Sequence, residues 1–258
     1  MRILVITEEE EFYLPLSIEY LLTNSTDQIL EVVCARNPLL PSRFAAVRKF
    51  YKAFGLGPVL SAALRAGKAK VKDTFGWLNF SGRYYSVRAV CSAHNVPYLH
   101  CDNINSPQFI QHCQQLNVEL IASVSPTQIF KEKLINLPRY GCINIHTAKL
   151  PKYRGLYPVY WAMACGEKTI GVSVHYIEKG IDTGKILLQD EVEIPSAATL
   201  DRMLTITKLK GAELLIEVIK QLNSGTSSAC YAQGEGGYFS FPTPQSYQEF
   251  KRHGYKLW

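Results

Sequence analysis

The stretch "LIASVSPTQIFKEKLINLPRYGCINIHT", residues 120–147, joins two short apolar runs through a segment of helical length. The runs 120–125 and 142–147 have the length and the apolar content of buried strands, whereas the segment 127–136 between them reads as a helix. A strand, a helix and a second strand in this order form a βαβ unit, whose two strands are parallel. The stretch therefore predicts a parallel sheet covered by helices.

The same alternation continues on both sides of this unit. Further strands are predicted at 2–6, 29–35, 96–101, 169–177 and 185–194, and further helices at 14–24, 84–94, 106–116, 157–165 and from Ser196 to the segment 223–225. No helix separates the last two strands, so we expect them to form an antiparallel extension. The sequence as a whole predicts an α/β fold with a Rossmann-like, mostly parallel sheet flanked by helices.

Composition indicates an ordinary globular protein of 258 residues, 47% hydrophobic and 19% charged. No apolar run approaches the ~20 residues of a membrane span, and the start "MRILVITEEEEF" does not resemble a signal peptide. Seven cysteines without framework spacing favour reduced thiols, so we expect a cytoplasmic protein without a transmembrane segment. Several cysteines and histidines lie within 91–113 but lack the paired spacing of zinc ligands, so we interpret the thiols as buried and expect no metal site.

Two polar clusters interrupt the predicted strands. Asn144 and His146 lie two positions apart, so strand alternation places them on one face. Asp182 lies in a loop between Gly180 and Gly184, after the strand 169–177. Each feature has a plain structural interpretation, as satisfied polar groups at a strand end or as a turn former. Open α/β sheets place their sites at strand ends, where these residues would emerge.

The turn after the first strand argues against nucleotide cofactors. A dinucleotide site has the pattern G-x-G-x-x-G there, so that backbone amides approach the pyrophosphate. This chain has "TEEEEFYLP", residues 7–15, with four acids and no glycine. A nicotinamide or flavin dehydrogenase and a P-loop enzyme are both disfavoured.

The two clusters together resemble a known family. "NIHTAKLPKYRG", residues 144–155, followed by "GVSVHYIEKGIDTGKIL", residues 171–187, is similar to the signature of the 10-formyltetrahydrofolate-dependent formyltransferases. That family includes glycinamide ribonucleotide formyltransferase and the catalytic domain of methionyl-tRNA formyltransferase. The similarity covers roughly residues 80–195. It implies an N-formyltransferase with N10-formyltetrahydrofolate as co-substrate.

The resemblance implies roles for individual residues. It makes Asn144, His146 and Asp182 catalytic: the first two as donors to the developing oxyanion, and Asp182 as a proton relay that orients His146. It places the folate pocket largely on backbone groups. The folate-binding residues so implied are Ser123, Val124, Ser125, Glu178, Gly180 and Ile181. His175 reads as a residue on a strand face that could reach the site.

The acceptor stays open at this point. The acidic first turn departs from the glycine-rich, phosphate-binding loop expected of a glycinamide ribonucleotide enzyme. About 30 residues after Ser227 are too few for the second domain of a methionyl-tRNA formyltransferase. We therefore expect a stand-alone formyltransferase for a small-molecule amine, an amino sugar nucleotide or an amine derived from an amino acid. The alternatives are a formyltetrahydrofolate hydrolase and a methionyl-tRNA formyltransferase-like enzyme.

Residues 36–72 form a distinct segment with nine Lys or Arg and no acid. Its larger apolar residues recur at helical spacing, which predicts a helical insertion. These residues are Phe44, Val47, Phe50, Tyr51 and Phe54. The plain interpretation is that this stripe packs inward. The functional ones are a cradle for a phosphorylated acceptor or a peripheral contact with an anionic membrane, whereas DNA binding lacks a supporting domain.

The predicted organisation is a catalytic domain over 1–225, carrying the insertion at 36–72, and a C-terminal extension over 226–258 packed on it. A homodimer remains an open alternative.

Overall fold

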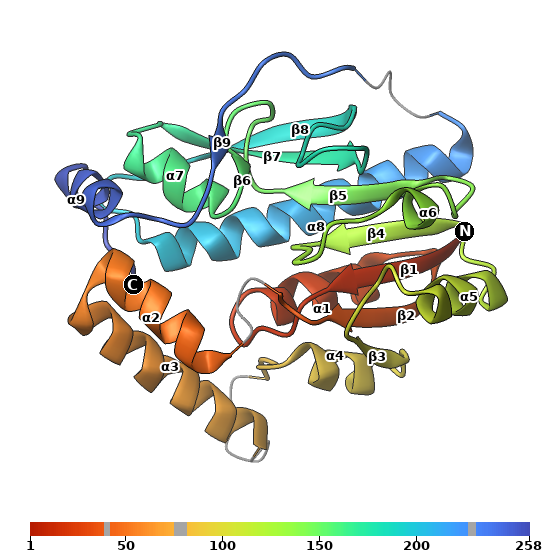
Figure 1. Ribbon diagram of the computed structural model, residues 1–258, viewed down its shortest axis with the longest axis horizontal. Helices are drawn as coiled ribbons and strands as arrows, with labels where there is room; N and C mark the ends of the chain where they lie inside the picture. The colour runs from red at the N-terminus through yellow and green to blue at the C-terminus, as the bar shows by residue number, and fades with distance from the viewer. Residues whose placement is uncertain (39–41, 75–81, 227–230) are drawn as a thin grey trace.

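The computed structural model describes residues 1–38, 42–74, 82–226 and 231–258 (Figure 1). Its centre is a seven-stranded sheet with the order β3-β2-β1-β4-β5-β7-β8. The strands are β1 (Arg2–Thr7), β2 (Gln28–Ala35), β3 (Tyr98–Cys101), β4 (Leu120–Val124), β5 (Cys142–His146), β7 (Thr169–Tyr176) and β8 (Ile186–Glu193). All seven predicted strands are present, each within two residues of its expected bounds.

Strand direction confirms the mostly parallel sheet. The strands β3, β2, β1, β4 and β5 are parallel neighbours. β7 pairs antiparallel with β5, and β8 pairs antiparallel with β7. The two strands of the expected extension, β7 and β8, are therefore antiparallel to each other, and β7 is also antiparallel to β5.

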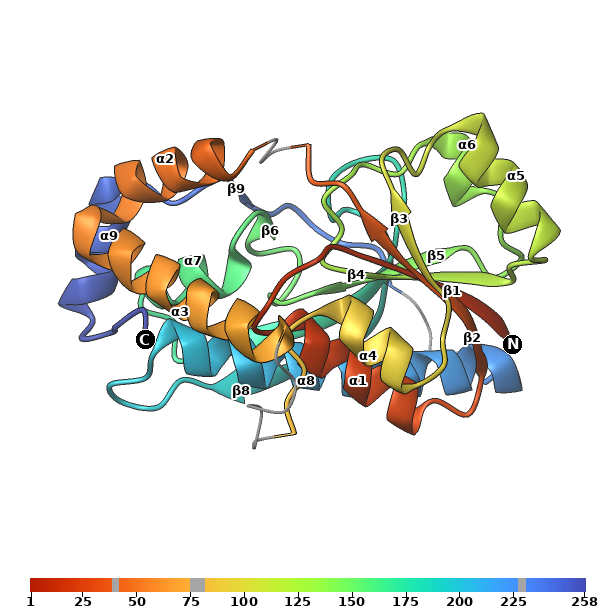
Figure 2. The ribbon, with the colours of Figure 1, turned by 90° about the horizontal axis from the view of Figure 1, so that it is seen from below.

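Helices cover both faces of the sheet (Figure 2). One face packs on α1 (Leu14–Asn24), α4 (Val87–Ala93) and α8 (Leu200–Ser224). The opposite face packs on α5 (Pro107–Gln115) and α6 (Glu132–Ile135). Because successive residues of a strand point to opposite faces, Ile143 and Ile145 face α8 and its neighbours, whereas Cys142 faces α6.

Outside the basic segment, each predicted helix except 14–24 is shorter in the structure, and two of these cases have a clear local reason. The helix expected at 127–136 is only the single turn α6, because Gln128 donates instead to the carbonyls of Arg36 and Asp102 in neighbouring loops. The long helix expected from Ser196 begins at Leu200. Ala197 has a φ of +58°, outside the helical region, and the side chain of Thr199 caps the first turn.

A further core lies beside the sheet and joins three helices distant in sequence. They are α2 (Arg43–Phe54), α7 (Pro158–Ala164) and α9 (Pro244–Arg252). Phe54 packs edge-on against Tyr160 at 5.7 Å between ring centroids, and Tyr160 stacks on Phe250 at 5.2 Å. α9 thus lies against α7 and α2 (Figure 1). A short two-stranded sheet, β6 (Arg154–Gly155) with β9 (Tyr238–Phe239), lies nearby.

The basic segment contains two helices, α2 and α3 (Leu56–Thr74). Phe54 is buried and Phe50 is partly buried against the same core. The plain interpretation, in which the whole stripe packs inward, does not hold for Phe44, Val47 and Tyr51, which are 79%, 50% and 54% exposed. Residues 39–41 of the predicted insertion and 227–230 of the predicted C-terminal extension lie outside the described residues.

The cysteines that the sequence placed near histidines are mostly inside the protein. Cys91 and Cys113 are fully buried, and burial raises the pKa of Cys91 to about 11 and of Cys113 to about 12. His100, by contrast, is largely exposed. Among the helices that the structure describes, none combines the length and apolarity required to cross a bilayer.

Candidate functional site

A row of polar side chains crosses three neighbouring strands. Ser123 of β4 is in register with Asn144 of β5, and Asn144 is in register with His175 of β7. Asn144 is 3% exposed and His175 is 2% exposed. Paired residues point to the same face of a sheet, so these three side chains lie together, on the face that carries Cys142 near the start of β5. His146 follows on the same face, at the carboxyl end of β5.

The loop after β7 brings Asp182 to this row. β7 ends near the start of β5, because the two strands are antiparallel, so the loop has to fold back to reach His146. Gly184 permits this close return: a Cβ atom there would lie 1.9 Å from the carbonyl oxygen of Tyr176. Asp182 Oδ2 then accepts a hydrogen bond from the backbone N–H of Gly155 at 2.8 Å.

Asp182 faces both histidines. Its Oδ2 lies 3.5 Å from Nδ1 of His146, and its Oδ1 lies 3.7 Å from Nε2 of His175. The other ring nitrogen of His146, Nε2, lies 2.8 Å from the carbonyl oxygen of Tyr153 and donates to it. The nitrogen of His146 that faces the carboxylate is therefore Nδ1.

The orientation of Asn144 follows from the state of His175. Burial lowers the pKa of His175 to about 4, so the ring is neutral near pH 7. Its Nδ1 donates to the carbonyl oxygen of Tyr176 at 2.8 Å, which leaves Nε2 as an acceptor. Asn144 Nδ2 donates to that Nε2 at 3.2 Å. The second N–H of Asn144 thus remains for another partner, and its buried Oδ1 has no partner in the described part of the chain.

Backbone conformation marks the same region. Seven non-glycine residues in the described ranges have positive φ, and four of them surround this cluster: Ser125, Tyr153, Tyr157 and Asp182. Left-handed backbone is unfavourable for most side chains and persists where surrounding contacts enforce it, often at functional sites.

The six residues implied for folate binding divide into two segments. Ser123 and Val124 are buried in β4, and the Ser123 hydroxyl has no partner among the described residues. Ser125 accepts a hydrogen bond from the Lys208 ammonium of α8. Glu178, Gly180 and Ile181 are exposed in the loop after β7. Strand pairing places the first segment, 123–125, beside Asn144. The second segment, 178–181, directly precedes Asp182, which lies beside His146.

A second polar cluster lies at the carboxyl end of β1. Glu8 accepts a hydrogen bond from Asn37 at 3.0 Å, and burial raises its pKa to about 7 despite the attraction of Lys208. Glu9 and Glu10 bind backbone instead: Glu9 accepts from the N–H of Val87, and Glu10 from the N–H groups of Phe12, Tyr13 and Leu14 where α1 begins. Glu8 thus has a raised pKa and no backbone hydrogen-bond partner in the described ranges.

Glu8 interacts electrostatically with Tyr157. Besides burial, the charge of Glu8 contributes to raising the pKa of Tyr157 to about 12. Tyr157 lies two residues after Gly155, the donor to Asp182. Sequence reasoning did not single out Glu8 or Lys208 as site residues, because they are far apart in the sequence and no local pattern reports their electrostatic interaction.

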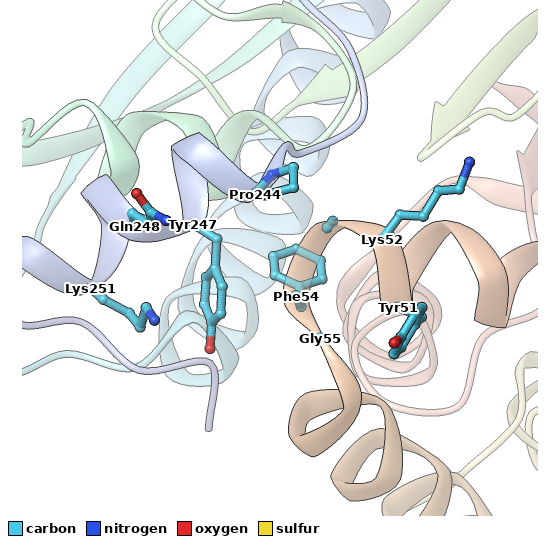
Figure 3. Close-up of a pocket in the computed structure, with 9 residues that line it drawn as sticks. Tyr51, Lys52, Phe54, Gly55, Pro244, Tyr247, Gln248 and Lys251 are labelled. Atoms are coloured by element: carbon cyan, nitrogen blue, oxygen red, sulfur yellow. The ribbon is translucent and has the colours of Figure 1, made fainter.

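A separate open groove of about 380 Å³ lies between the end of α2 and α9 (Figure 3). It is lined by Tyr51, Lys52, Ala53, Phe54, Gly55, Pro244, Tyr247, Gln248 and Lys251. None of the candidate catalytic or folate-binding residues is among them.

The chain is similar to known proteins. The family model described as "Formyl transferase" matches residues 78–219. A methionyl-tRNA formyltransferase of Caldanaerobacter subterraneus subsp. tengcongensis is 41% identical over 125 residues, which are 47% of this chain and 39% of the relative. The chain spans about half the length of the curated relatives it matches.

Solved structures share the fold. Phosphoribosylglycinamide formyltransferase from Bacillus halodurans has a TM-score of 0.61 at 15% identity, covering 90% of this chain and 100% of the other. WlaRD, a sugar 3N-formyl transferase with a structure in the presence of dTDP and 5-N-formyl-THF, has a TM-score of 0.56 at 20% identity, covering 93% and 70%. The fold is shared and the family model matches more than half of the chain, so this protein belongs to the formyl transferase family.

Proposed function

We propose that this protein transfers a formyl group from N10-formyltetrahydrofolate to the primary amine of a small molecule. The observation that carries the proposal is the cluster of Asn144, His146 and Asp182, held at one end of the sheet by three separate chain segments. Family membership supports the reaction class.

The site suits a bound folate. Two buried polar atoms in adjacent register, Ser123 Oγ and Asn144 Oδ1, have no partner among the described residues. Buried polar groups normally have a partner, so a ligand with several donors and acceptors would satisfy them. Bound there, N10-formyltetrahydrofolate supplies the formyl carbon to which the amine nitrogen bonds while the carbon–N10 bond breaks.

Asn144, Asp182 and His146 have separate roles in the transfer. Asn144 donates its second N–H to the formyl oxygen, where negative charge develops. Asp182, in contact range of His146 Nδ1, takes the proton that the amine loses. Asp182 and His146 then return a proton to N10 of the folate as the carbon–N10 bond breaks. His146 Nε2 already donates to the carbonyl oxygen of Tyr153. We therefore assign His146 to proton transfer together with Asp182. Asn144 is the residue that we assign to the formyl oxygen.

His175 has a positioning role that a variant can test. Replacing His175 with Ala removes the acceptor that orients Asn144, and we expect kcat to fall by up to about 10²-fold with little change in either KM. His175→Gln keeps an acceptor and should recover part of the rate. If His175→Ala retains the wild-type kcat, the orientation of Asn144 does not depend on it.

The pH profile gives a second readout for His175. Its folded pKa of about 4 lies below the ordinary value of 6.5, so the unfolded chain takes up this proton first and stability declines as the pH falls through this interval. Once protonated, Nε2 becomes a donor and no longer accepts from Asn144. The part of the acidic loss of kcat that protonation of His175 causes in the wild type should therefore be missing in His175→Gln.

The acidic turn narrows the acceptor class. Glu8 offers a carboxyl that interacts with Tyr157, two residues after the N–H donor to Asp182, so an acceptor phosphate is disfavoured at this position and an ammonium or hydroxyl is favoured. This supports a small amine whose cationic or hydroxyl groups face β1.

Glu8→Gln tests that assignment through function and stability together. We expect the acceptor KM to rise about tenfold at pH 8, because a charged partner is lost, while the folate KM is unchanged. The wild-type carboxyl is harder to ionise in the folded state, so it lowers stability as the pH rises from 4.5 to about 7. The variant should therefore melt at a higher temperature than the wild type at pH 8, but not at pH 4.

The exposed Glu11→Gln provides the matched control, since it removes the same charge three residues away. Equal acceptor KM values for Glu8→Gln and Glu11→Gln would show that Glu8 does not face the acceptor. Equal melting temperatures at pH 8 would show that its ionisation carries no penalty in the folded state.

The proposed function is tested by screening amines with N10-formyltetrahydrofolate and following the folate product by absorbance. The panel contains amino sugar nucleotides, amines derived from amino acids, and methionyl-tRNA. We expect turnover with a small amine. Equal folate production without any amine would identify a hydrolase, and turnover only with methionyl-tRNA would identify the tRNA-modifying alternative.

A further inference from the structure

The helical hairpin formed by α2 and α3 presents apolar side chains outward. On α3, Leu56, Leu60, Leu64 and Val71 are 60%, 56%, 68% and 49% exposed. Their spacings of four, four and seven residues place them on one stripe of the helix. A surface helix normally turns such a stripe towards the core, and here it faces away from the protein.

The opposite side of α3 makes the contacts with the rest of the protein. Ala69 is 2% exposed, and Arg65 pairs with Asp201 of α8. The Arg65 guanidinium also lies over the rings of Phe12 and Trp258, at 5.2 Å and 5.0 Å from their centroids. These contacts fix the rotation of α3 and therefore the outward direction of its leucine stripe.

The helix α2 repeats the pattern. Phe44, Val47 and Tyr51 recur at three and four residues and are at least half exposed, whereas Phe54 anchors the helix in the core. Seven of the twelve large apolar side chains that are exposed in the described part of the chain belong to this hairpin. Figure 1 shows the hairpin at the periphery, outside the layers that cover the sheet.

Cations flank both stripes. Arg48, Lys49 and Lys52 are exposed on α2, and Lys68, Lys70 and Lys72 on α3. No acid occurs between residues 36 and 72. Lys251 of α9 adds a cation across the groove from Lys52 (Figure 3). The surface thus combines exposed large apolar side chains with mostly positive charge; Asp73, in the last turn of α3, is an acid and accepts a hydrogen bond from Ser86.

We propose that this hairpin docks on an anionic lipid bilayer, with the leucine and phenylalanine side chains in the interfacial region and the lysines at the headgroups. Apolar residues flanked by Lys and Arg are the pattern of helices that lie in a membrane surface. A second copy of this chain is a poorer occupant, because a symmetric contact through the hairpin would bring two basic surfaces together. A nucleic acid would satisfy the lysines but leave the leucine stripe in water.

Vesicle sedimentation tests this proposal directly. The full chain is mixed with vesicles of phosphatidylcholine alone, or of equal parts phosphatidylcholine and phosphatidylglycerol, at about 50 mM and about 500 mM salt. We expect binding to the anionic vesicles at low salt, weaker binding at high salt, and little binding to the neutral vesicles.

Two variants separate the charge from the apolar contribution. Lys68→Gln with Lys70→Gln should weaken partitioning onto anionic vesicles about tenfold or more, and Leu60→Ser with Leu64→Ser should weaken it by at least as much. Lys133→Gln with Lys220→Gln removes the same charge from exposed positions outside the hairpin and should bind as the wild type does. All six positions are exposed, so melting temperatures should be unchanged.

Three outcomes would overturn the proposal. The first is sedimentation with neutral vesicles as strong as with anionic vesicles, or a loss of binding in Lys133→Gln with Lys220→Gln as large as in Lys68→Gln with Lys70→Gln. The second is absence of vesicle binding together with a dimer, detected by light scattering, that Leu60→Ser with Leu64→Ser dissociates. The third is absence of vesicle binding together with salt-dependent binding of an RNA duplex.

Discussion

Asp182→Asn should lower kcat by about 10²–10⁴-fold and leave the folate KM and the melting temperature close to those of the wild type. Asparagine keeps a side-chain oxygen for the N–H of Gly155, and it tolerates the left-handed φ of +51° at this position. What it removes is the negative charge and the proton acceptor beside His146. A steady-state kinetic comparison at saturating folate measures the effect.

Asp102→Asn is the matched control, because Asp102 is largely exposed in the loop after β3. It should retain full activity. If Asp182→Asn also retains near-normal kcat, Asp182 only forms the turn, and the mechanism loses its proton acceptor.

Asn144→Ala should lower kcat by about 10²–10³-fold, which corresponds to about 2.7–4 kcal/mol of transition-state stabilisation. This loss reflects removal of one preorganised N–H donor to the formyl oxygen. The folate KM should change much less than kcat, since the donor acts mainly where charge develops. Kinetics and melting curves of the same preparation separate this effect from unfolding.

The exposed Asn223→Ala on α8 serves as the control for loss of an amide side chain. A decrease in the melting temperature of Asn144→Ala without a decrease in kcat would assign Asn144 a purely structural role, as the partner of His175.

The fold was largely predictable, because apolar runs and helical spacing locate its strands and most of its helices. The helix predicted at 14–24 occupies those residues in the structure. The errors lie where a contact distant in sequence decides the conformation. Gln128 leaves the helical pattern to bond loops near residues 36 and 102, and no local pattern in its own segment reports those partners.

The position of the strand residues of the candidate site was predictable from the sequence. The side chains that contact them were less predictable. Alternation alone places Asn144 and His146 on one face, and family resemblance singles out Asp182. The contact of His175 with Asn144 depends on the antiparallel register of β5 and β7, which the sequence does not specify. The raised pKa of Glu8 depends on its burial in the folded protein, which no pattern in its own segment reports.

The direction of the apolar stripe of the basic hairpin stayed open at the level of the sequence for a related reason. Helical spacing predicts that apolar residues share a face, but it does not say whether that face points inward. Contacts of Arg65 and Ala69 with the rest of the protein fix the rotation of α3, and Phe54 does the same for α2.

The fate of the formyl carbon tests the central claim most directly. N10-formyltetrahydrofolate labelled with carbon-13 in the formyl group is incubated with the protein and the amine that gives the fastest turnover, and the label is followed by NMR. We predict that the label appears in a new formamide of the acceptor, at a rate that Asp182→Asn and Asn144→Ala each lower at least about 10²-fold. Label that accumulates only as formate, at the same rate with and without amine, would contradict the account.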